Sequence, residues 1–440
     1  MGFSTPDILS FGATAHEGPN RAFLGVLEGT APIRELSPAS PSDTYVAVHA
    51  PLARLDAAIA PHQEVLATPA LVIDLDAVEH NIAALLRRCE GKSRSWRPHV
   101  KTVKQAVILR LLFTQGVLSC KCATLDELEL VLTTADAAAV RVDVLIAYPL
   151  HQRAFRAAIS LAKAHPKSQV SFLADSPAHA RDMQSWLDDD SSCWPLFLDV
   201  DVGMHRTGTF AARWRVHAAT LAKELKGFKI AGLHGYDGHL QADEQAQANA
   251  AYDELCTLAE AIIATGVPLS ELITSGSHTY AIALEHRRLG NGAWRHSICP
   301  GTILLNDLRC RAATADLDLW QAAFVATRVI SRDGCRRITV DAGSKALSPD
   351  RPAPNCRVLG WPELIPKDAS EEHLPMWVGG LATPALGQLL WLVPDHVCTT
   401  VNLYNIALLI SGQEVVGESP IASGRCLWLH PPAQDSADAD

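Results

Sequence analysis

The chain has 440 residues, of which 48% are hydrophobic and 20% are charged, and its formal net charge at neutral pH is −10. This is the composition of an ordinary globular protein, and the length suits one large α/β domain with a smaller second one. The negative charge, with no basic stripe among aromatic residues, argues against a nucleic-acid partner.

The N-terminus and the cysteines predict where the protein works. The opening "MGFSTPDILSFG" lacks the basic and apolar regions of a secretory signal, and Pro6 breaks the myristoylation pattern. No apolar run is long enough to span a membrane. The 11 cysteines are scattered and odd in number, which is typical of reduced thiols. We therefore expect a cytoplasmic protein without a membrane partner.

Clusters of Pro, Ser and Ala, such as "SPASPSDTY", predict a partly irregular N-terminal extension over residues 1–65. The first domain then begins at residue 66. "ALVIDL" (70–75) is an apolar strand, and we expect Asp76 to cap the helix that follows.

Strand-like and helix-like stretches alternate up to residue 310. Eight short strands with crossover helices predict an α/β fold, namely a (β/α)8 TIM-type barrel over residues 66–310, in which nearly continuous apolar strands are buried on both sides. The expected barrel strands are 95–101, 119–124, 142–149, 170–176, 195–204, 230–238, 271–279 and 296–302.

After residue 310 the pattern changes to short alternating runs, such as "RRITVDAG" and "LLWLVPDHV". These predict a C-terminal mostly-β domain over residues 311–430. The last residues, 431–440, should form a loose acidic tail.

Lys101 ends the first expected barrel strand, in "RPHVKT". The ends of barrel strands meet at one face, where the active site of such a fold lies. A lysine held there can be nucleophilic and can form a Schiff base with pyridoxal phosphate, whose ring acts as an electron sink. The alternative is an ordinary solvated lysine.

A pyridoxal cofactor needs a phosphate cradle, and two loops could supply it. Ser275, Gly276 and Ser277 follow the seventh expected strand, and Gly301 follows the eighth. Glycine allows close backbone approach, and hydroxyl and amide groups donate hydrogen bonds to phosphate. Loops at these positions are the usual phosphate site of such barrels. The alternative is a pair of ordinary turns.

Three further residues lie at glycine-rich strand ends. Arg206, in "DVGMHRTG", could donate to the ring region of the cofactor. Tyr236 and His239, in "GYDGH", could act as hydrogen-bonding or acid–base groups. The alternatives are a surface arginine and a structural histidine.

The expected β domain contains His396 and Cys398 in "PDHVCTTVNLY". In a strand, residues two positions apart point to the same side, so the imidazole and the thiolate can converge. Together they form a zinc-type ligand pair that leaves positions open for water or substrate. The alternative is a buried cysteine beside a hydrogen-bonded histidine.

Taken in order, "RPHVKT", "DVGMHRTG", "GYDGH", "PGT…ND", "DAGSKALSPD", "EEH" and "PDHVCTTVNLY" resemble the D-serine dehydratase and D-threonine aldolase family. These are fold-type III pyridoxal phosphate enzymes, similar in architecture to alanine racemase, and the resemblance covers about residues 66–430. It implies that Lys101 is the Schiff-base lysine and that His396 and Cys398 hold a divalent metal. It also implies a head-to-tail homodimer and a D-amino acid as the substrate.

Three details bear on the substrate. The His-x-Cys pair resembles the zinc site of D-serine dehydratases, whereas D-threonine aldolases more often show His-x-Asp with a harder metal. "TTVNLY" is more similar to the aldolases. Lys104 stands where family members often carry a histidine.

The resulting expectation is a lyase that depends on pyridoxal phosphate and on Zn²⁺ or another divalent metal, and that converts D-serine to pyruvate and ammonia. Arg206, Tyr236 and the loop 275–277 would hold the cofactor. One alternative is a D-threonine aldolase in which His239 is the base. An amino-acid racemase and a non-catalytic carrier of pyridoxal phosphate are further alternatives.

Overall fold

The computed structural model describes residues 49–187, 192–334, 336–380 and 382–423. Most of the expected N-terminal extension and the whole acidic tail lie outside the described residues. The described end of the extension is helical, with α1 (His49–Ile59) followed by the short 3-10 helix η3 (Ala60–His62). Within the described ranges, no helix combines the length and the apolar character that crossing a membrane requires.

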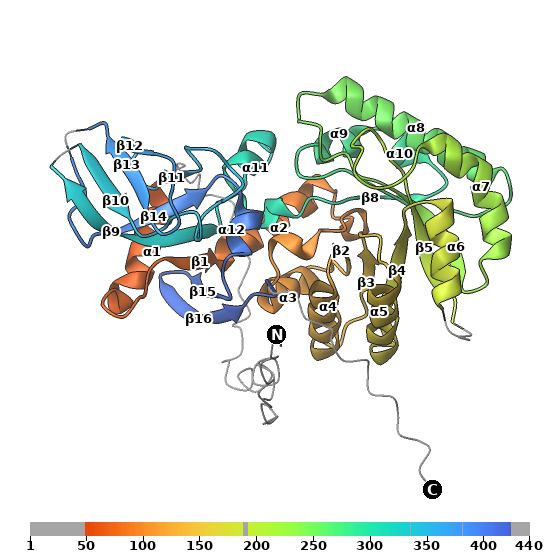
Figure 1. Cartoon of the computed structure of the whole chain (residues 1–440), viewed down its shortest axis with the longest axis horizontal. Coiled ribbons are helices and arrows are strands. Elements are labelled where there is room, and N and C mark those ends of the chain that lie inside the picture. The colour runs from red at the N-terminus through yellow and green to blue at the C-terminus, as the bar shows by residue number, and fades with distance from the viewer. Residues whose placement is uncertain (1–48, 188–191, 335, 381, 424–440) are drawn as a thin grey trace, which may run out of the picture. The chain divides into compact units, whose positions relative to one another are not determined.

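A curled parallel sheet forms the barrel (Figure 1). Each of its strands pairs with the next strand in the sequence, which is the order expected of a (β/α)8 barrel. The strands are β2 (Ser119–Cys122), β3 (Asp143–Ile146), β4 (Gln169–Ala174), β5 (Trp194–Asp199), β6 (Phe228–Gly235), β7 (Glu271–Thr274) and β8 (Arg295–Ile298). The crossover helices are α3 (Ala106–Thr114), α4 (Leu125–Ala137), α5 (Gln152–Ala164), α6 (Pro177–Trp186), α7 (Ala211–Glu224), α8 (Gln245–Ile263), α9 (Tyr280–Glu285) and α10 (Arg287–Asn291).

The first expected barrel strand is reduced to two isolated bridges. Trp96 pairs in parallel with Ile298 of β8, and His99 pairs in parallel with Lys121 of β2. The segment therefore lies between β8 and β2 and fills the eighth place in the ring. It cannot pair further, because proline has no backbone N–H and the 3-10 helix η5 (Val100–Thr102) begins directly after His99. The predicted barrel is thus confirmed.

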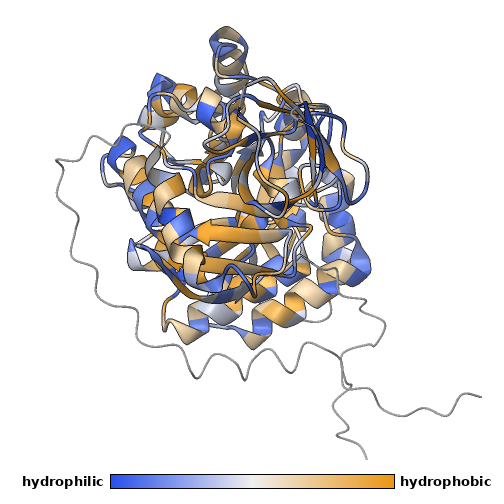
Figure 2. Ribbon diagram, turned by 90° about the vertical axis from the view of Figure 1, so that its left-hand side faces the viewer, coloured by the Kyte–Doolittle hydropathy of each residue, from blue (hydrophilic) through white to orange (hydrophobic). Residues whose placement is uncertain are grey.

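Apolar side chains fill the barrel interior and the layer between its strands and helices. In Figure 2 the strands are predominantly in the hydrophobic colour, whereas the surrounding helices alternate between hydrophobic and hydrophilic residues. Such alternation is expected of amphipathic helices that cover a sheet. The cluster inside the barrel comprises Leu145, Leu173, Phe197, Ile273 and Cys299.

Ion pairs close the N-terminal end of the barrel, away from the strand ends that were expected to carry the chemistry. Arg97 is fully buried, and its guanidinium lies 2.7 Å from a carboxylate oxygen of Asp143 and 2.8 Å from one of Glu271. Arg295 also pairs with Glu271. A cavity of about 260 Å³ lies beside this cluster. Satisfied charges of this kind fix one arrangement of the strands that contribute them.

The second sheet is mostly antiparallel, so the expected mostly-β domain is also confirmed. One of its strands comes from early in the chain, because β1 pairs in parallel with β15 and antiparallel with β9. The apolar run 70–75 is therefore a strand, but it belongs to this sheet and not to the barrel. The strands are β1 (Ala70–Asp74), β9 (Ala323–Asp333), β10 (Arg337–Val340), β11 (Cys356–Val358), β12 (Leu364–Pro366), β13 (Leu374–Val378), β14 (Leu389–Pro394), β15 (Ile406–Ser411) and β16 (Glu414–Pro420).

The helix after β1, α2 (Leu75–Arg88), begins two residues earlier than a cap at Asp76 would allow. Its cap is Asp74, whose side chain accepts a hydrogen bond from the Ala77 backbone N–H at 3.2 Å. Asp76 instead accepts hydrogen bonds from Ser411 and Gly412 at 2.7 Å each, which attach the helix to the turn after β15. The expected cap at Asp76 is therefore wrong.

Candidate active site

Lys101 lies in η5, directly after the segment that closes the barrel. The ring of His99 accepts a hydrogen bond from the Lys101 backbone N–H at 3.3 Å, and this contact begins the short helix. The Lys101 side chain is exposed. Its position at the C-terminal end of this reduced strand is the one expected for a reactive residue at a barrel mouth.

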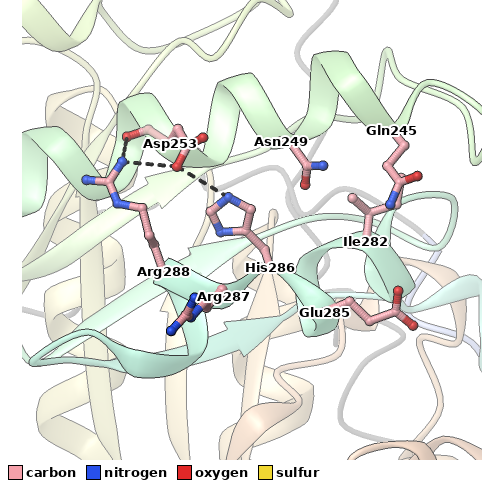
Figure 3. Close-up of a pocket in the computed structure, with 8 residues that line it drawn as sticks. All are labelled: Gln245, Asn249, Asp253, Ile282, Glu285, His286, Arg287 and Arg288. Carbon is pink, nitrogen blue, oxygen red and sulfur yellow. Dashed lines mark hydrogen bonds and ion pairs between the residues drawn. The ribbon is translucent and has the colours of Figure 1, made fainter.

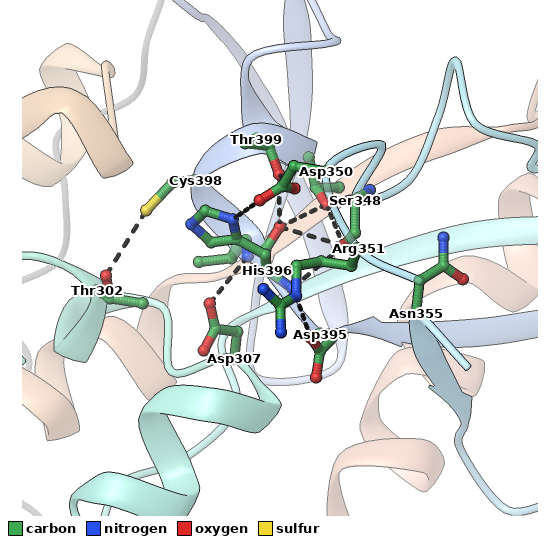
Figure 4. Close-up of polar contacts among 12 residues, drawn as sticks. Thr302, Asp307, Ser348, Asp350, Arg351, Asn355, Asp395, His396, Cys398 and Thr399 are labelled. Carbon is green, nitrogen blue, oxygen red and sulfur yellow. Dashed lines mark hydrogen bonds and ion pairs between the residues drawn. The ribbon is translucent and has the colours of Figure 1, made fainter. Parts of the chain in front are cut away.

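Cys398 reaches the barrel mouth from the second domain. Its Sγ lies 3.2 Å from Oγ1 of Thr102, the neighbour of Lys101, and 3.6 Å from Oγ1 of Thr302. Thr302 begins the 3-10 helix η6 (Thr302–Leu304) after the last barrel strand. Figure 4 shows the thiol directed at Thr302. The expected metal pair and the expected Schiff-base lysine therefore lie at one place.

His396 and Cys398 do not lie in a strand, so the predicted reason for their convergence is wrong. Strand β14 ends at Pro394, and helix α12 (Val397–Val401) begins after His396. The imidazole and the thiol interact nevertheless. The hydrogen bond with Cys398 raises the pKa of His396 to about 9, with a contribution from Asp350. Burial opposes ionisation of Cys398, but the His396 hydrogen bond and the charges of His396 and Lys101 lower the pKa of the thiol below its usual value.

Asp350 orients the His396 ring (Figure 4). One carboxylate oxygen lies 2.6 Å from Nδ1 of His396, and the other accepts a hydrogen bond from Oγ1 of Thr399 at 2.7 Å. Occupation of Nδ1 leaves Nε2 available as a ligand. A carboxylate behind a histidine in this way is the usual support of a metal-binding imidazole.

Two other side chains fix the start of α12. The backbone N–H of Val397 donates to Oδ2 of Asp307 at 2.9 Å, and the N–H of His396 donates to Oγ of Ser348 at 3.1 Å. Asp307 is buried, and burial raises the pKa of its carboxyl above the usual value. The Asp307 contact holds the ligand-bearing turn against the barrel loop that follows η6, and the Ser348 contact holds it within the second domain.

The chemistry of His396 and Cys398 is compatible with a metal ion that keeps open coordination positions. In the described part of the chain, no group of three or more His, Cys, Asp or Glu side chains could hold a metal ion. A thiolate and an imidazole with a supporting carboxylate satisfy the ligand preferences of zinc, and solvent or substrate can take the remaining positions.

The loop after β7 has the features of an anion cradle. Ser275 is fully buried in a left-handed backbone conformation, with φ 61°, and among the described residues its Oγ has no hydrogen-bond partner. Gly276 lies against Tyr236, because an added Cβ would be 3.3 Å from that ring. Ser277 follows, half-buried. A buried hydroxyl without a partner fits a ligand such as phosphate, so these residues are compatible with the expected cofactor.

Gly301 allows the end of β8 to touch the segment that carries Lys101. A Cβ at this position would lie 2.5 Å from the carbonyl oxygen of His99, which is closer than real contacts permit. The glycine is therefore required for close approach of two backbones at the barrel mouth.

Arg206 and Tyr236 lie together, as expected. The guanidinium carbon of Arg206 is 5.0 Å from the centre of the Tyr236 ring, and Nζ of Lys121 is 5.2 Å from it. Both are cation–π distances. Lys121 was not singled out from the sequence, because a lysine inside a short strand reads as an ordinary polar residue.

Lys121 begins a buried polar chain that crosses the barrel. Its ammonium lies 3.2 Å from Nε2 of His234, whose Nδ1 lies 2.7 Å from Oδ1 of Asp199. Burial is the largest cause that lowers the pKa values of Lys121, His234 and nearby His99. The floor of the candidate site therefore holds an amine and two imidazoles that are all biased towards their neutral forms.

His239 lies beside the loop that carries Arg206. Its side chain is exposed, and its Nε2 faces Gly203, where an added Cβ would lie 3.3 Å away. Among the described contacts, none joins it to Lys101 or to the His396–Cys398 pair. Its role as a base stays a prediction.

A second hollow, of about 340 Å³, lies between α8 and the residues 282–288 (Figure 3). Arg288 pairs there with Asp253, and His286 lies 3.5 Å from the same carboxylate. None of the predicted site residues lines it. We therefore place the candidate site at the barrel mouth.

Two family models match the chain, one on each domain. Residues 73–295, just over half of the chain, match the alanine racemase N-terminal domain, and residues 322–410 match a serine dehydratase domain. The two matches together contain every residue predicted for the site except Gly301, which lies between them.

Two individual proteins are similar to most of the chain. The chain is 27% identical over 387 residues to a D-threonine aldolase of Arthrobacter, covering 84% of this chain and 90% of the relative. It is 26% identical over 365 residues to the D-threo-3-hydroxyaspartate dehydratase of Delftia, covering 76% and 92%.

The fold also matches solved structures. The D-threonine aldolase of Filomicrobium marinum superposes with a TM-score of 0.72 at 24% identity, covering 82% of this chain and 96% of that structure. Barrel, β domain and both family models lead to one conclusion: the chain belongs to the D-serine dehydratase and D-threonine aldolase family of fold-type III pyridoxal phosphate enzymes.

Proposed function

We propose that the protein is a lyase that depends on pyridoxal phosphate and Zn²⁺ and removes water from D-β-hydroxy amino acids, with D-serine as the model substrate and pyruvate and ammonia as products. The observation that carries this proposal is the distance of 3.2 Å between Sγ of Cys398 and Oγ1 of Thr102, the residue next to Lys101. One of the two proposed metal ligands thus contacts the residue next to the lysine proposed for covalent chemistry.

Bound to a lysine, pyridoxal phosphate withdraws electrons from the α-carbon of an amino acid, while a divalent metal polarises a hydroxyl group. In the proposal Lys101 would hold the cofactor covalently, and its Nζ, set free when the substrate amine takes its place, would accept the α proton. The Ser275–Ser277 loop binds phosphate, and Arg206 and Tyr236 orient the ring. His396 and Cys398 would hold the metal, which would polarise the β-hydroxyl of the substrate.

Loss of water is favoured over cleavage between carbons for a chemical reason. Elimination needs help for the departing hydroxyl, which a zinc ion supplies as a Lewis acid. Aldol cleavage needs a base that removes the hydroxyl proton, and among the described contacts none joins the expected base, His239, to Lys101 or to the His396–Cys398 pair. The thiolate of Cys398 also selects zinc over manganese or magnesium.

The aldolase is nevertheless a second candidate, supported by the similarity to the Arthrobacter D-threonine aldolase. The test is incubation of the zinc-loaded holoenzyme with D-serine, D-threonine and D-threo-3-hydroxyaspartate, with 2-oxo acids and glycine measured in parallel. We expect 2-oxo acid and ammonia in equal amounts and no glycine. Glycine with an aldehyde, and no 2-oxo acid, would overturn the dehydratase proposal in favour of the aldolase.

Metal dependence forms the second half of the test. Removal of zinc with a chelator should abolish product formation, and added Zn²⁺ should restore it. The L-enantiomers serve as controls. Full activity after complete removal of metal would contradict the assigned role of His396 and Cys398.

A further inference from the structure

Lys104, three residues after Lys101, is buried at the contact between the barrel and the second domain. Its backbone is left-handed, with φ 51°, and the residue is only 8% exposed. Its carbonyl oxygen accepts a hydrogen bond from the N–H of Ala422, after the last strand of the second sheet, at 2.9 Å. A long side chain buried in a strained backbone conformation indicates a specific task.

The ammonium of Lys104 joins one partner from each domain. Nζ donates to Oδ1 of Asn402 at 2.7 Å and lies 3.5 Å from Oε1 of Glu127. Glu127 is 1% exposed, and its other oxygen accepts a hydrogen bond from the Ala123 N–H at 2.7 Å. Glu127, in the first turn of α4, therefore balances the buried charge from the side of the barrel domain, and the remaining donor capacity of Lys104 is directed at the second domain.

Asn402 is the C-cap of α12, the helix that contains Cys398. The segment 101–104 therefore touches this helix at two points, because Thr102 contacts Cys398 and Lys104 contacts Asn402. The other end of α12 is held by Asp307. A helix of five residues has little stability of its own, so its position depends on such contacts at its ends.

We propose that Lys104 is a positioning residue, which fixes the distance between Lys101 and the metal ligand Cys398 by holding the C-terminal end of α12. The inference rests on the proposed metal site. One short stretch of chain then carries both the lysine for the cofactor and the lysine that sets the place of the metal. Small displacements of reacting groups have large effects on catalysis. A contact that fixes their positions can therefore offset the free-energy cost of burying the Lys104 charge.

Asn402→Ala tests the link most directly, because it removes the contact and leaves the Lys104–Glu127 pair intact. We expect the affinity for Zn²⁺, measured by competition with a chromogenic chelator, to fall about tenfold, as when an outer partner of a ligand is lost. The stoichiometry of the borohydride-reducible cofactor adduct should stay unchanged. Asn402→Asp, which keeps an oxygen acceptor, should restore binding. Asn249→Ala on α8 is the matched control.

A second variant protects the test against misfolding. Lys104→Met combined with Glu127→Gln removes the ion pair without leaving a buried carboxylate alone, and it should weaken Zn²⁺ binding to the same extent. Variants that fold and bind Zn²⁺ as tightly as the wild type would overturn the positioning role alone. If Cys398→Ala binds Zn²⁺ as tightly as the wild type, the proposed metal site itself is wrong, and the inference fails with it.

Discussion

Asp350 uses both of its carboxylate oxygens to hold the metal-side turn, one on Nδ1 of His396 at 2.6 Å and one on Oγ1 of Thr399 at 2.7 Å. Thr399 follows Cys398 directly in the sequence. The Asp350 carboxylate therefore contacts one proposed ligand, His396, and the residue next to the other. Its effect on the metal is therefore twofold: it selects the ring nitrogen that faces the metal, and it restrains the turn that carries the thiol.

Replacement of Asp350 by alanine should lower the affinity for Zn²⁺ by about 10- to 100-fold, because the ring loses the partner that orients it. Chelator competition on the purified protein measures this directly. Asp333→Ala, which removes an exposed partner of Arg337, serves as the control. An unchanged affinity in the Asp350 variant would show that the imidazole is held by other contacts.

Replacement of Cys398 by aspartate should shift the preference of the site from Zn²⁺ towards Mn²⁺, since a carboxylate is a harder ligand than a thiolate. The quantity to measure is the ratio of the two dissociation constants, in the wild type and in the variant. A ratio that does not move would mean that Cys398 is not a ligand. The same variant tests whether the ligand decides between water loss and carbon–carbon cleavage.

Lys101→Ala should abolish the adduct that borohydride traps between pyridoxal phosphate and the protein. Lys121 is the nearest rival, since it is buried beside Tyr236 and has a lowered pKa. Peptide mapping of the reduced wild type should find the label on Lys101. Label on Lys121, or an adduct that survives in Lys101→Ala, would contradict the assignment.

Arg97→Met should destabilise the fold strongly, by about 3–5 kcal/mol, because it removes the fully buried guanidinium that pairs with both Asp143 and Glu271. Urea denaturation followed by circular dichroism gives this number. Combining Arg97→Met with Glu271→Gln should recover part of the loss. If Arg97→Met alone is neutral, the cluster contributes little to closing the barrel.

The same cluster predicts a dependence of stability on acid. Burial opposes ionisation of Asp143, but Arg97 and Arg295 together lower the pKa of its carboxyl below the usual 3.8. The unfolded chain therefore takes up this proton at a higher pH than the native one, so the contribution is complete above about pH 4 and is lost as the pH falls below that value. The stability difference between wild type and Asp143→Asn should narrow below about pH 4. If the difference in unfolding free energy between wild type and Asp143→Asn stays constant from pH 7 to pH 3, the Asp143 charge is not the source of the acid dependence.

The barrel could be predicted from the sequence because its strands are short, apolar and regularly separated by helices. What could not be predicted is the partner of each strand. The run 70–75 has the pattern of a barrel strand, yet it pairs with Phe324 and Leu408 in the other sheet. Burial on both faces gives the same apolar pattern in either sheet, so the local sequence does not distinguish them.

The candidate site was predictable where a residue stands in a characteristic local motif, as Lys101 and Cys398 do. Asp350 and Lys121 were missed because their roles come from residues far along the chain, His396 and His234. The junction of β14 and α12 was missed for a similar reason: "DHVCTTV" suits a strand by composition, but Asp307 and Ser348 supply the hydrogen bonds that begin a helix there.

The place of β1 between β9 and β15 has a consequence for how the protein is made. The barrel uses residues that leave the ribosome together, so it can begin to form during synthesis. β1 can pair with β15 only late in synthesis, because Leu409, the partner of Ile73, is among the last described residues to be translated. The second sheet therefore cannot form completely until the barrel residues, which lie between β1 and β9 in the sequence, have been translated. A fragment that begins after the barrel would lack β1, one of the inner strands of this sheet.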